Sequence, residues 1–194
     1  MKRFVTRLGP AAAALLAASP ALAHPGHPGG GFAAGVLHPF TGVDHLLAMV
    51  MVGLWSALAF PRRWWICPTA FVGCMTLGFV WGTSGAAFPW AETLILASLF
   101  GLGLALLFDA RVPLAAALPA IGLFAVGHGF AHGAEMPAGA GAGGFAAGFV
   151  IATVALHIAG VGLARMALHL RTQRLGQAIG AAATATAVAM LWAS

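Results

Sequence analysis

The sequence predicts an all-α integral membrane protein in which six transmembrane helices form a compact bundle after a cleaved signal peptide. Of its 194 residues, 61% are hydrophobic and only 7% are charged, whereas soluble proteins carry about 25% charged residues. No soluble fold could bury this much apolar surface, so the chain needs lipid as its solvent. The net charge of +5 does not indicate a nucleic-acid partner, because the arginines are few and scattered between apolar runs.

Residues 1–23 have the three parts of a secretory signal peptide. A basic head, "MKRFVTR", is followed by the apolar stretch "LGPAAAALLAASP" and by the small residues "ALA" at a cleavage site. Cleavage after Ala23 leaves residues 24–39 as a short periplasmic leader rich in His, Gly and Pro, and residues 40–194 as the membrane domain. The alternative is that the first segment is retained as an additional span.

The membrane domain contains six apolar runs, each long enough to cross about 30 Å of hydrocarbon. The runs are separated in order by "PRRWW", "FPW", "DARVP", "MPAGAGAGG" and "RMALHLRTQR", which combine helix-breaking or charged residues. Small-xxx-small glycine pairs in four runs favour close helix packing in lipid, for example Gly78/Gly82, Gly129/Gly133 and Gly144/Gly148. The expected spans are residues 40–60, 66–87, 91–108, 112–134, 143–164 and 175–193.

All arginines after the signal peptide fall in alternate loops, namely those that follow the first, third and fifth spans. The positive-inside rule makes these loops cytoplasmic and places both mature termini in the periplasm. The signal peptide independently requires the same position for the amino terminus. The expected location is therefore the bacterial inner (cytoplasmic) membrane, with several crossings. The arginines are Arg62, Arg63, Arg111, Arg165, Arg171 and Arg174.

Histidines and carboxylates gather near the outer ends of three spans. Ionisable groups within a span cost roughly 3 kcal/mol or more each unless they are paired or wet, so several at one depth indicate a common partner. Imidazole and carboxylate together are ligands for divalent nickel, cobalt, copper or zinc. The cluster therefore predicts a metal site. Its candidate ligands are His38, Asp44, His45, Glu92, His128, His132 and Glu135.

Each candidate also has an interpretation that needs no metal. Asp44 with Thr41 fits a capping box, and Glu92 complements the positive end of the third helix. The two histidines of the fourth span could hydrogen-bond between helices, and Glu135 could be a solvated loop residue. Independent causes of this kind need not coincide at one depth, which favours the shared site.

Four further residues are accessory candidates. A mature chain starting at His24 offers an amine and an imidazole together, with His27 nearby, although a disordered leader is the alternative. Met49 lies one turn after His45 and is either a soft thioether ligand or core. His157 lies deeper in the fifth span, where an inner relay ligand and a hydrogen bond between helices are equally open interpretations.

At these residues the sequence resembles the HupE/UreJ family of hydrogenase- and urease-associated nickel permeases. The pattern H-P-x-x-G-x-D-H-x-x-x-M-x-x-x-G is matched from His38 to Gly53, and H-G-x-A-H-G-x-E is matched from His128 to Glu135. The resemblance covers essentially the whole chain. It implies a transporter rather than an enzyme, one that takes up nickel, or cobalt in some relatives, for metalloenzyme assembly.

The resemblance also implies residue roles. Within the two motifs it assigns metal handling to the histidines, to Asp44 and to Glu135. Glu92 stands at the place of a family carboxylate, and Phe71 matches a family aromatic whose role the sequence does not reveal. The transported ion is the expected ligand, and no resident cofactor is expected.

Two other classes of function remain open. The His/Asp/Glu cluster could hold zinc and a reactive water in an integral-membrane hydrolase. A metal sensor or binding subunit would bind the ion without moving it. The sequence contains no GxxxxGK[ST] phosphate loop, so the chain itself is not expected to hydrolyse ATP. The sequence does not specify the oligomeric state.

Overall fold

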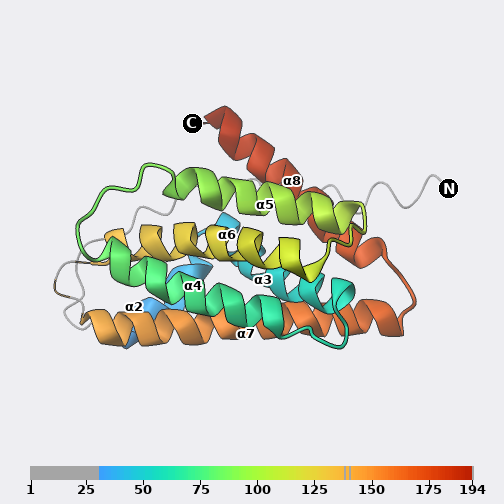
Figure 1. Ribbon diagram of the computed structural model, residues 1–194, viewed down its shortest axis with the longest axis horizontal. Helices are drawn as coiled ribbons and strands as arrows, with labels where there is room; N and C mark the ends of the chain where they lie inside the picture. Colours follow the sequence, from blue (N-terminus) through green and yellow to red (C-terminus); the bar gives the residue numbers. More distant parts are fainter. Residues whose placement is uncertain (1–30, 138, 140, 194) are drawn as a thin grey trace.

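The computed structural model describes residues 31–137, 139 and 141–193, and this part of the chain is all helical, without a β-strand (Figure 1). The predicted signal peptide and the candidates His24 and His27 lie outside the described residues. The elements are α2 (Phe32–Leu37), the 3-10 helix η2 (His38–Phe40), α3 (Val43–Ala59), α4 (Ile66–Gly82), α5 (Ala91–Leu107), α6 (Leu114–Ala134), α7 (Ala142–His169) and α8 (Arg174–Ala193).

Each of the six expected spans corresponds to one helix, from α3 to α8. The largest differences are at two ends. Helix α4 ends at Gly82 rather than near residue 87, because the chain turns through Gly85, whose φ of 74° favours glycine. Helix α7 runs to His169, since no helix-breaking residue precedes the left-handed turn at Arg171.

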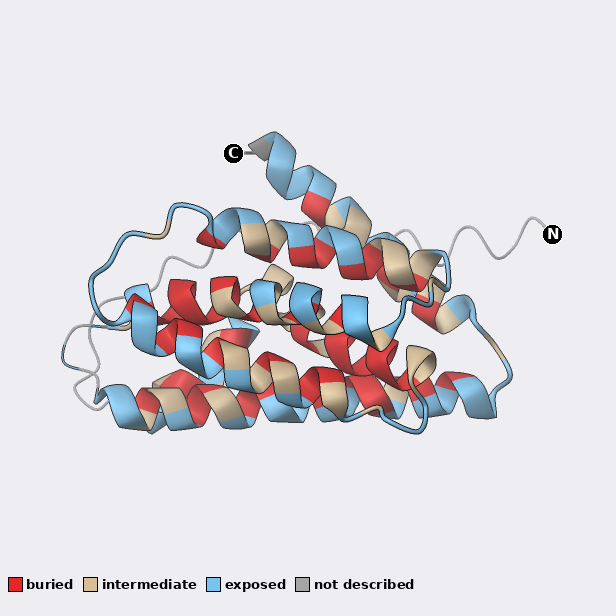
Figure 2. Ribbon diagram, in the orientation of Figure 1, coloured by how far each residue is buried: buried red, intermediate tan, exposed pale blue. Residues whose placement is uncertain are grey.

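The apolar helices are those of a membrane protein. Helices α6, α7 and α8 are each long and apolar enough to cross a bilayer, and residues 32–59 pass the same test as one span bent by 85°. Helices α4 and α5 have 17 residues each, which reach about 26 Å. Buried residues face the bundle interior in Figure 2, while outward positions hold large apolar side chains such as Leu77 and Ile158. Six crossings therefore stay a prediction.

Residues 32–39, which the sequence analysis assigned to the leader, pack against α7. A Cβ on Gly35 would collide with the Phe145 carbonyl, and one on Gly148 would collide with the Phe32 carbonyl. The glycine pair of α7 therefore accommodates α2. The sharp bend between η2 and α3 brings His38 against the bundle rather than leaving it in a free leader.

Helices α4 and α6 pack through the glycine pairs that the sequence predicted. Gly78 and Gly82 meet the α6 backbone at Val126 and Phe130, while Gly129 and Gly133 meet the α4 backbone. A Cβ at any of these glycines would collide with main-chain atoms of the other helix. The close approach fixes the depth and rotation of α6, the helix that carries two of the candidate histidines.

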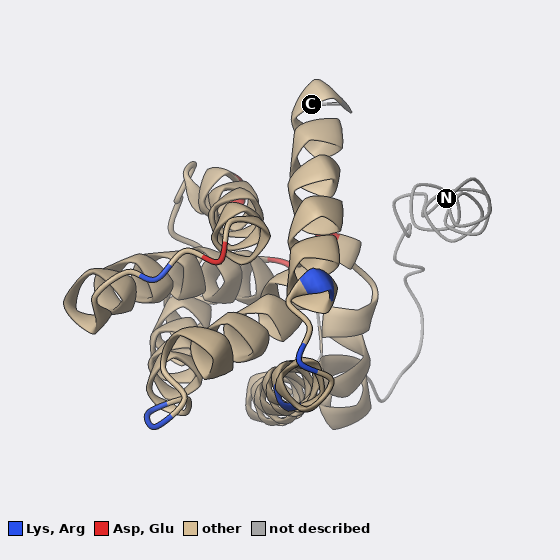
Figure 3. Cartoon of the chain, turned by 90° about the vertical axis from the view of Figure 1, so that its right-hand side faces the viewer, with Lys and Arg blue, Asp and Glu red and all other residues tan. Residues whose placement is uncertain are grey.

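The two ends of the bundle differ in charge. The loops joining α3 to α4, α5 to α6 and α7 to α8 lie at one end, on the right in Figure 1. The arginines of the described chain lie in these loops and the adjoining helix ends, as Figure 3 shows from that side. The end of α6 and the start of α7 lie at the opposite end, and α3 begins part-way along the bundle. The histidine-rich and arginine-rich ends are thus separated by the length of the helices.

Candidate metal site

Five of the seven predicted ligands come together in two overlapping groups at the end of the bundle away from the arginines. In the inner group, His45 of α3 joins His128 and His132 of α6, with one ring nitrogen of each within 4.8 Å of the others. In the outer group, His38 of η2 joins His132 and Glu135 within the same limit. Two ligand atoms on one ion lie at most about 4.2 Å apart, so small side-chain movements would complete either group.

His132 lies at the centre because two backbone features direct the other rings toward it. The four-residue spacing of His128 and His132 puts both on one face of α6. The bend between η2 and α3 then places His38 and His45 on either side of His132, with ring centroids 4.5 and 4.4 Å from it. The His45 and His128 rings are 5.0 Å apart.

The two groups differ in access to solvent. His128 and His132 are 0% and 2% exposed, and the Phe149 ring lies 4.3 Å from His132. In the outer group, the side chains of His38 and Glu135 are 23% and 60% exposed, with 4.0 Å between His38 Nε2 and Glu135 Oε2. An ion could therefore reach the outer group from water, whereas the inner group is closed.

Asp44 belongs to neither group and acts on His45 instead. The His45 Nδ1–H donates to Asp44 Oδ1 over 2.9 Å, because a carboxylate can only accept. The lone pair of the neutral ring is then on Nε2, which is buried without a hydrogen-bond partner in the described chain. The capping-box interpretation is wrong, because the N-cap is Gly42 and the Thr41 hydroxyl donates to the His38 carbonyl.

Ser98 of α5 orients His128 in a comparable way, and the sequence analysis did not find it. Its hydroxyl donates to the Ile95 carbonyl at 2.7 Å, and its Oγ lies 3.0 Å from His128 Nε2. With its one hydrogen used, the hydroxyl accepts from Nε2–H, which leaves the His128 lone pair on Nδ1. Partners of this kind fix the tautomer of metal-binding histidines. A single serine in an apolar run gives no sequence signal of such a role.

The result is a set of buried imidazole nitrogens with nothing to bond to among the described residues. Each unpaired buried polar atom costs about 1–3 kcal/mol, and such atoms in a folded protein require an explanation. A cation that accepts several lone pairs at once provides one. These atoms are His38 Nε2, His45 Nε2, His128 Nδ1 and both ring nitrogens of His132.

Glu92 is exposed in the first turn of α5 and lies outside both groups, a position that also suits the helix-dipole interpretation. It still affects the outer group. Partial burial, followed by the nearby carboxylates of Glu92 and Asp44, raises the pKa of Glu135 above its ordinary value. A cation bound here would relieve this repulsion.

The remaining accessory candidates lie deeper in the bundle. Met49 is fully buried in the main hydrophobic core, as the core interpretation expected. Phe71 lies between two histidines, with its ring centroid 5.6 Å from that of His128 and 5.2 Å from that of His157. Neither Phe71 nor His157 belongs to the two groups.

The fold and the site together define a helical membrane protein with a buried, histidine-rich site suited to a divalent cation. The chain belongs to the HupE/UreJ family, whose model, described as "HupE / UreJ protein", matches residues 12–190. It is 41% identical over 179 residues to Protein HupE of Rhizobium leguminosarum bv. viciae, covering 92% of this chain and 94% of that protein. No solved structure matches the chain.

Replacing Asp44 with asparagine should weaken nickel binding roughly 10- to 100-fold, since Asp44 holds the His45 ring in the tautomer that exposes Nε2. Equilibrium dialysis of the purified chain measures the change. Asp109→Asn is the matched control, because Asp109 makes the same kind of carboxylate contact at the arginine end, 3.9 Å from Arg111. Equal affinities for the wild type and Asp44→Asn would contradict the assigned role.

Replacing Ser98 with alanine should weaken nickel binding by about tenfold or more, because His128 loses the partner that fixes its tautomer. Ser56→Ala is the control: Ser56 is equally buried, but its hydroxyl donates to the Trp64 carbonyl, far from the histidines. The same dialysis assay compares the two variants. If both lose affinity equally, the effect is general loss of packing and the Ser98 role is wrong.

Proposed function

We propose that this protein is a secondary permease that takes up divalent nickel, or cobalt, across the bacterial inner membrane for assembly of a hydrogenase or urease. The inner group carries the proposal: two buried imidazoles of α6 and a partly buried one of α3, with lone pairs that no described residue satisfies. Imidazole is a preferred ligand for these borderline metals. Membership in the HupE/UreJ family supports a role in handling metal for these enzymes.

The proposed orientation places the outer group toward the periplasm and the arginines toward the cytoplasm. It is supported by the position of the arginine-bearing loops at the opposite end of the bundle from the end of α6, whose C-cap is Glu135, since basic loops stay in the cytoplasm. In this arrangement all six helices from α3 to α8 cross the membrane, residues 1–23 are removed as a signal peptide, and both mature termini are periplasmic.

Transport would begin at the outer group, where the exposed Glu135 carboxylate and His38 can replace part of the hydration shell of the ion. His132 is common to both groups. A neutral imidazole has one lone pair, so His132 can complete only one group at a time. The ion would therefore pass from the outer to the inner group while remaining bound to protein. Moderate affinity at each step allows release.

The membrane zinc hydrolase is the second candidate function. A hydrolytic site needs an open coordination position beside a route for the substrate. The α6 histidines of the inner group are instead buried, with the Phe149 ring centroid 4.3 Å from that of His132. This enclosure favours an ion over a lipid-like substrate as the species handled. A sensor or binding subunit would share the site but show no flux.

Uptake of radioactive nickel into vesicles that contain only the purified chain tests the proposal. The wild type should accumulate nickel above empty vesicles, with competition by cobalt and zinc ranking the cargo. His132→Asn should lower uptake at least tenfold, because it removes the ligand common to both groups. His169→Asn, at the exposed end of α7, is the control and should transport normally. No uptake by the wild type, with or without a proton gradient, would contradict autonomous transport.

A further inference from the structure

His157, in the middle of α7, is a buried histidine that neither group uses. Its side chain is 2% exposed, and both ring nitrogens lack a hydrogen-bond partner in the part of the chain that the structure describes. A neutral imidazole carries one donor and one acceptor, and leaving both unsatisfied in an apolar interior is unfavourable. A histidine that only joined helices would hydrogen-bond to a neighbouring helix. The ring nitrogens of His157 do not do so within the described chain.

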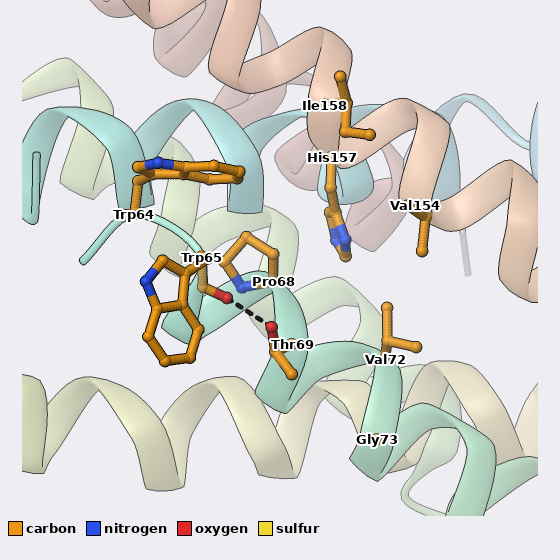
Figure 4. A pocket seen from close by; sticks show the side chains of 9 residues that line it. All are labelled: Trp64, Trp65, Pro68, Thr69, Val72, Gly73, Val154, His157 and Ile158. Atoms are coloured by element: carbon orange, nitrogen blue, oxygen red, sulfur yellow. Dashed lines mark hydrogen bonds between the residues drawn. The ribbon is translucent and has the colours of Figure 1, made fainter. Parts of the chain in front are cut away.

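The His157 ring borders a cavity between α4 and α7. The cavity has a volume of about 450 Å³, and its wall includes Trp64 and Trp65 at the start of α4, Pro68, and Val154 of α7. Figure 4 shows the ring directed from α7 toward α4, among these side chains. The Trp64 side adjoins the arginine end, where the Arg165 guanidinium lies 5.7 Å from the Trp64 ring centroid. The cavity wall is mostly apolar, so a water or an ion would be held there chiefly at the His157 ring.

Phe71 lies between the His157 ring at this cavity and His128 of the inner group. It is fully buried, and its ring contacts His128 on one side and His157 on the other, at centroid distances of 5.6 and 5.2 Å. The three rings form a continuous series from the inner group toward the arginine end. Movement of the Phe71 ring would therefore open a direct path between His128 and His157.

We infer that His157 is a further binding station for a divalent cation, on the opposite side of Phe71 from the inner group. This inference rests on the proposed function and extends it to the half of the pathway near the arginine end. A single imidazole supplemented by water holds a borderline cation weakly. Weak binding suits a station from which the ion leaves, because conduction requires that each site also release its ion.

The described lining residues supply chemistry consistent with release. Besides His157, the cavity wall contains the hydroxyl of Thr69, which already donates to the Trp65 carbonyl at 2.7 Å. None of these lining residues is acidic. The cavity therefore offers one nitrogen ligand and no carboxylate that would retain the ion.

Replacing His157 with leucine separates this role from a structural one. Equilibrium nickel affinity should stay within about twofold, because the inner and outer groups are both intact, while vesicle uptake should fall about tenfold. Thr153→Val is the matched control, since Thr153 is a buried polar residue one turn earlier on α7 whose hydroxyl contacts Met75 Sδ at 3.7 Å. It should transport normally. His157→Gln serves as a second variant, which keeps polarity but ligates poorly, and should also lose uptake.

Tryptophan fluorescence gives a readout that does not depend on transport. Nickel near His157 should quench Trp64 and Trp65 in a weak, saturable phase, which His157→Leu and the double variant Trp64→Phe/Trp65→Phe should both abolish. Normal uptake by His157→Leu, or a weak phase that persists in it, would overturn the inference. Failure of wild-type uptake with the His157-dependent phase present would instead reject the permease proposal and leave the His157 station supported.

Discussion

The rest of the site depends on one physical constraint: a neutral imidazole always presents one donor and one acceptor, and this fold buries several rings without partners for all of them. For His45 and His128 the protein satisfies one nitrogen, through Asp44 and Ser98. The other nitrogen of each is buried with its lone pair unpaired. Lipid tails offer no hydrogen-bond donor to these lone pairs. A bound cation would accept these lone pairs and so remove the cost of burying the nitrogens unpaired.

The fold enforces this arrangement through two backbone features rather than through the histidines themselves. Glycine contacts let α4 and α6 approach until main-chain atoms touch, which sets the position of His128 and His132. The 85° bend before α3 brings η2 and α3 to the same ring of His132 from two directions. The small residues that make the helices pack closely are therefore also the ones that hold the ligands together.

Sequence reasoning predicted the helices and most of the site because both have local signals. Apolar length indicated the positions of α3 to α8, and the four-residue spacing placed His128 and His132 on one face. The division into two groups around His132 has no such signal, because it depends on the bend and on side-chain rotamers. For the same reason the sequence placed Asp44 among the ligands without revealing that its carboxylate accepts a hydrogen bond from His45. Ser98 and the packing of α2 on α7 depend on contacts between distant segments, which one sequence does not reveal.

The central claim is that an imidazole of α6 shares one divalent ion with an imidazole of either α3 or η2, and X-ray absorption spectroscopy of the nickel-loaded full-length chain tests it most directly. The account predicts nickel coordinated by two or three imidazole nitrogens at about 2.0–2.1 Å, with fewer in a His132→Asn variant. A coordination shell made only of oxygen atoms, unchanged in that variant, would contradict it.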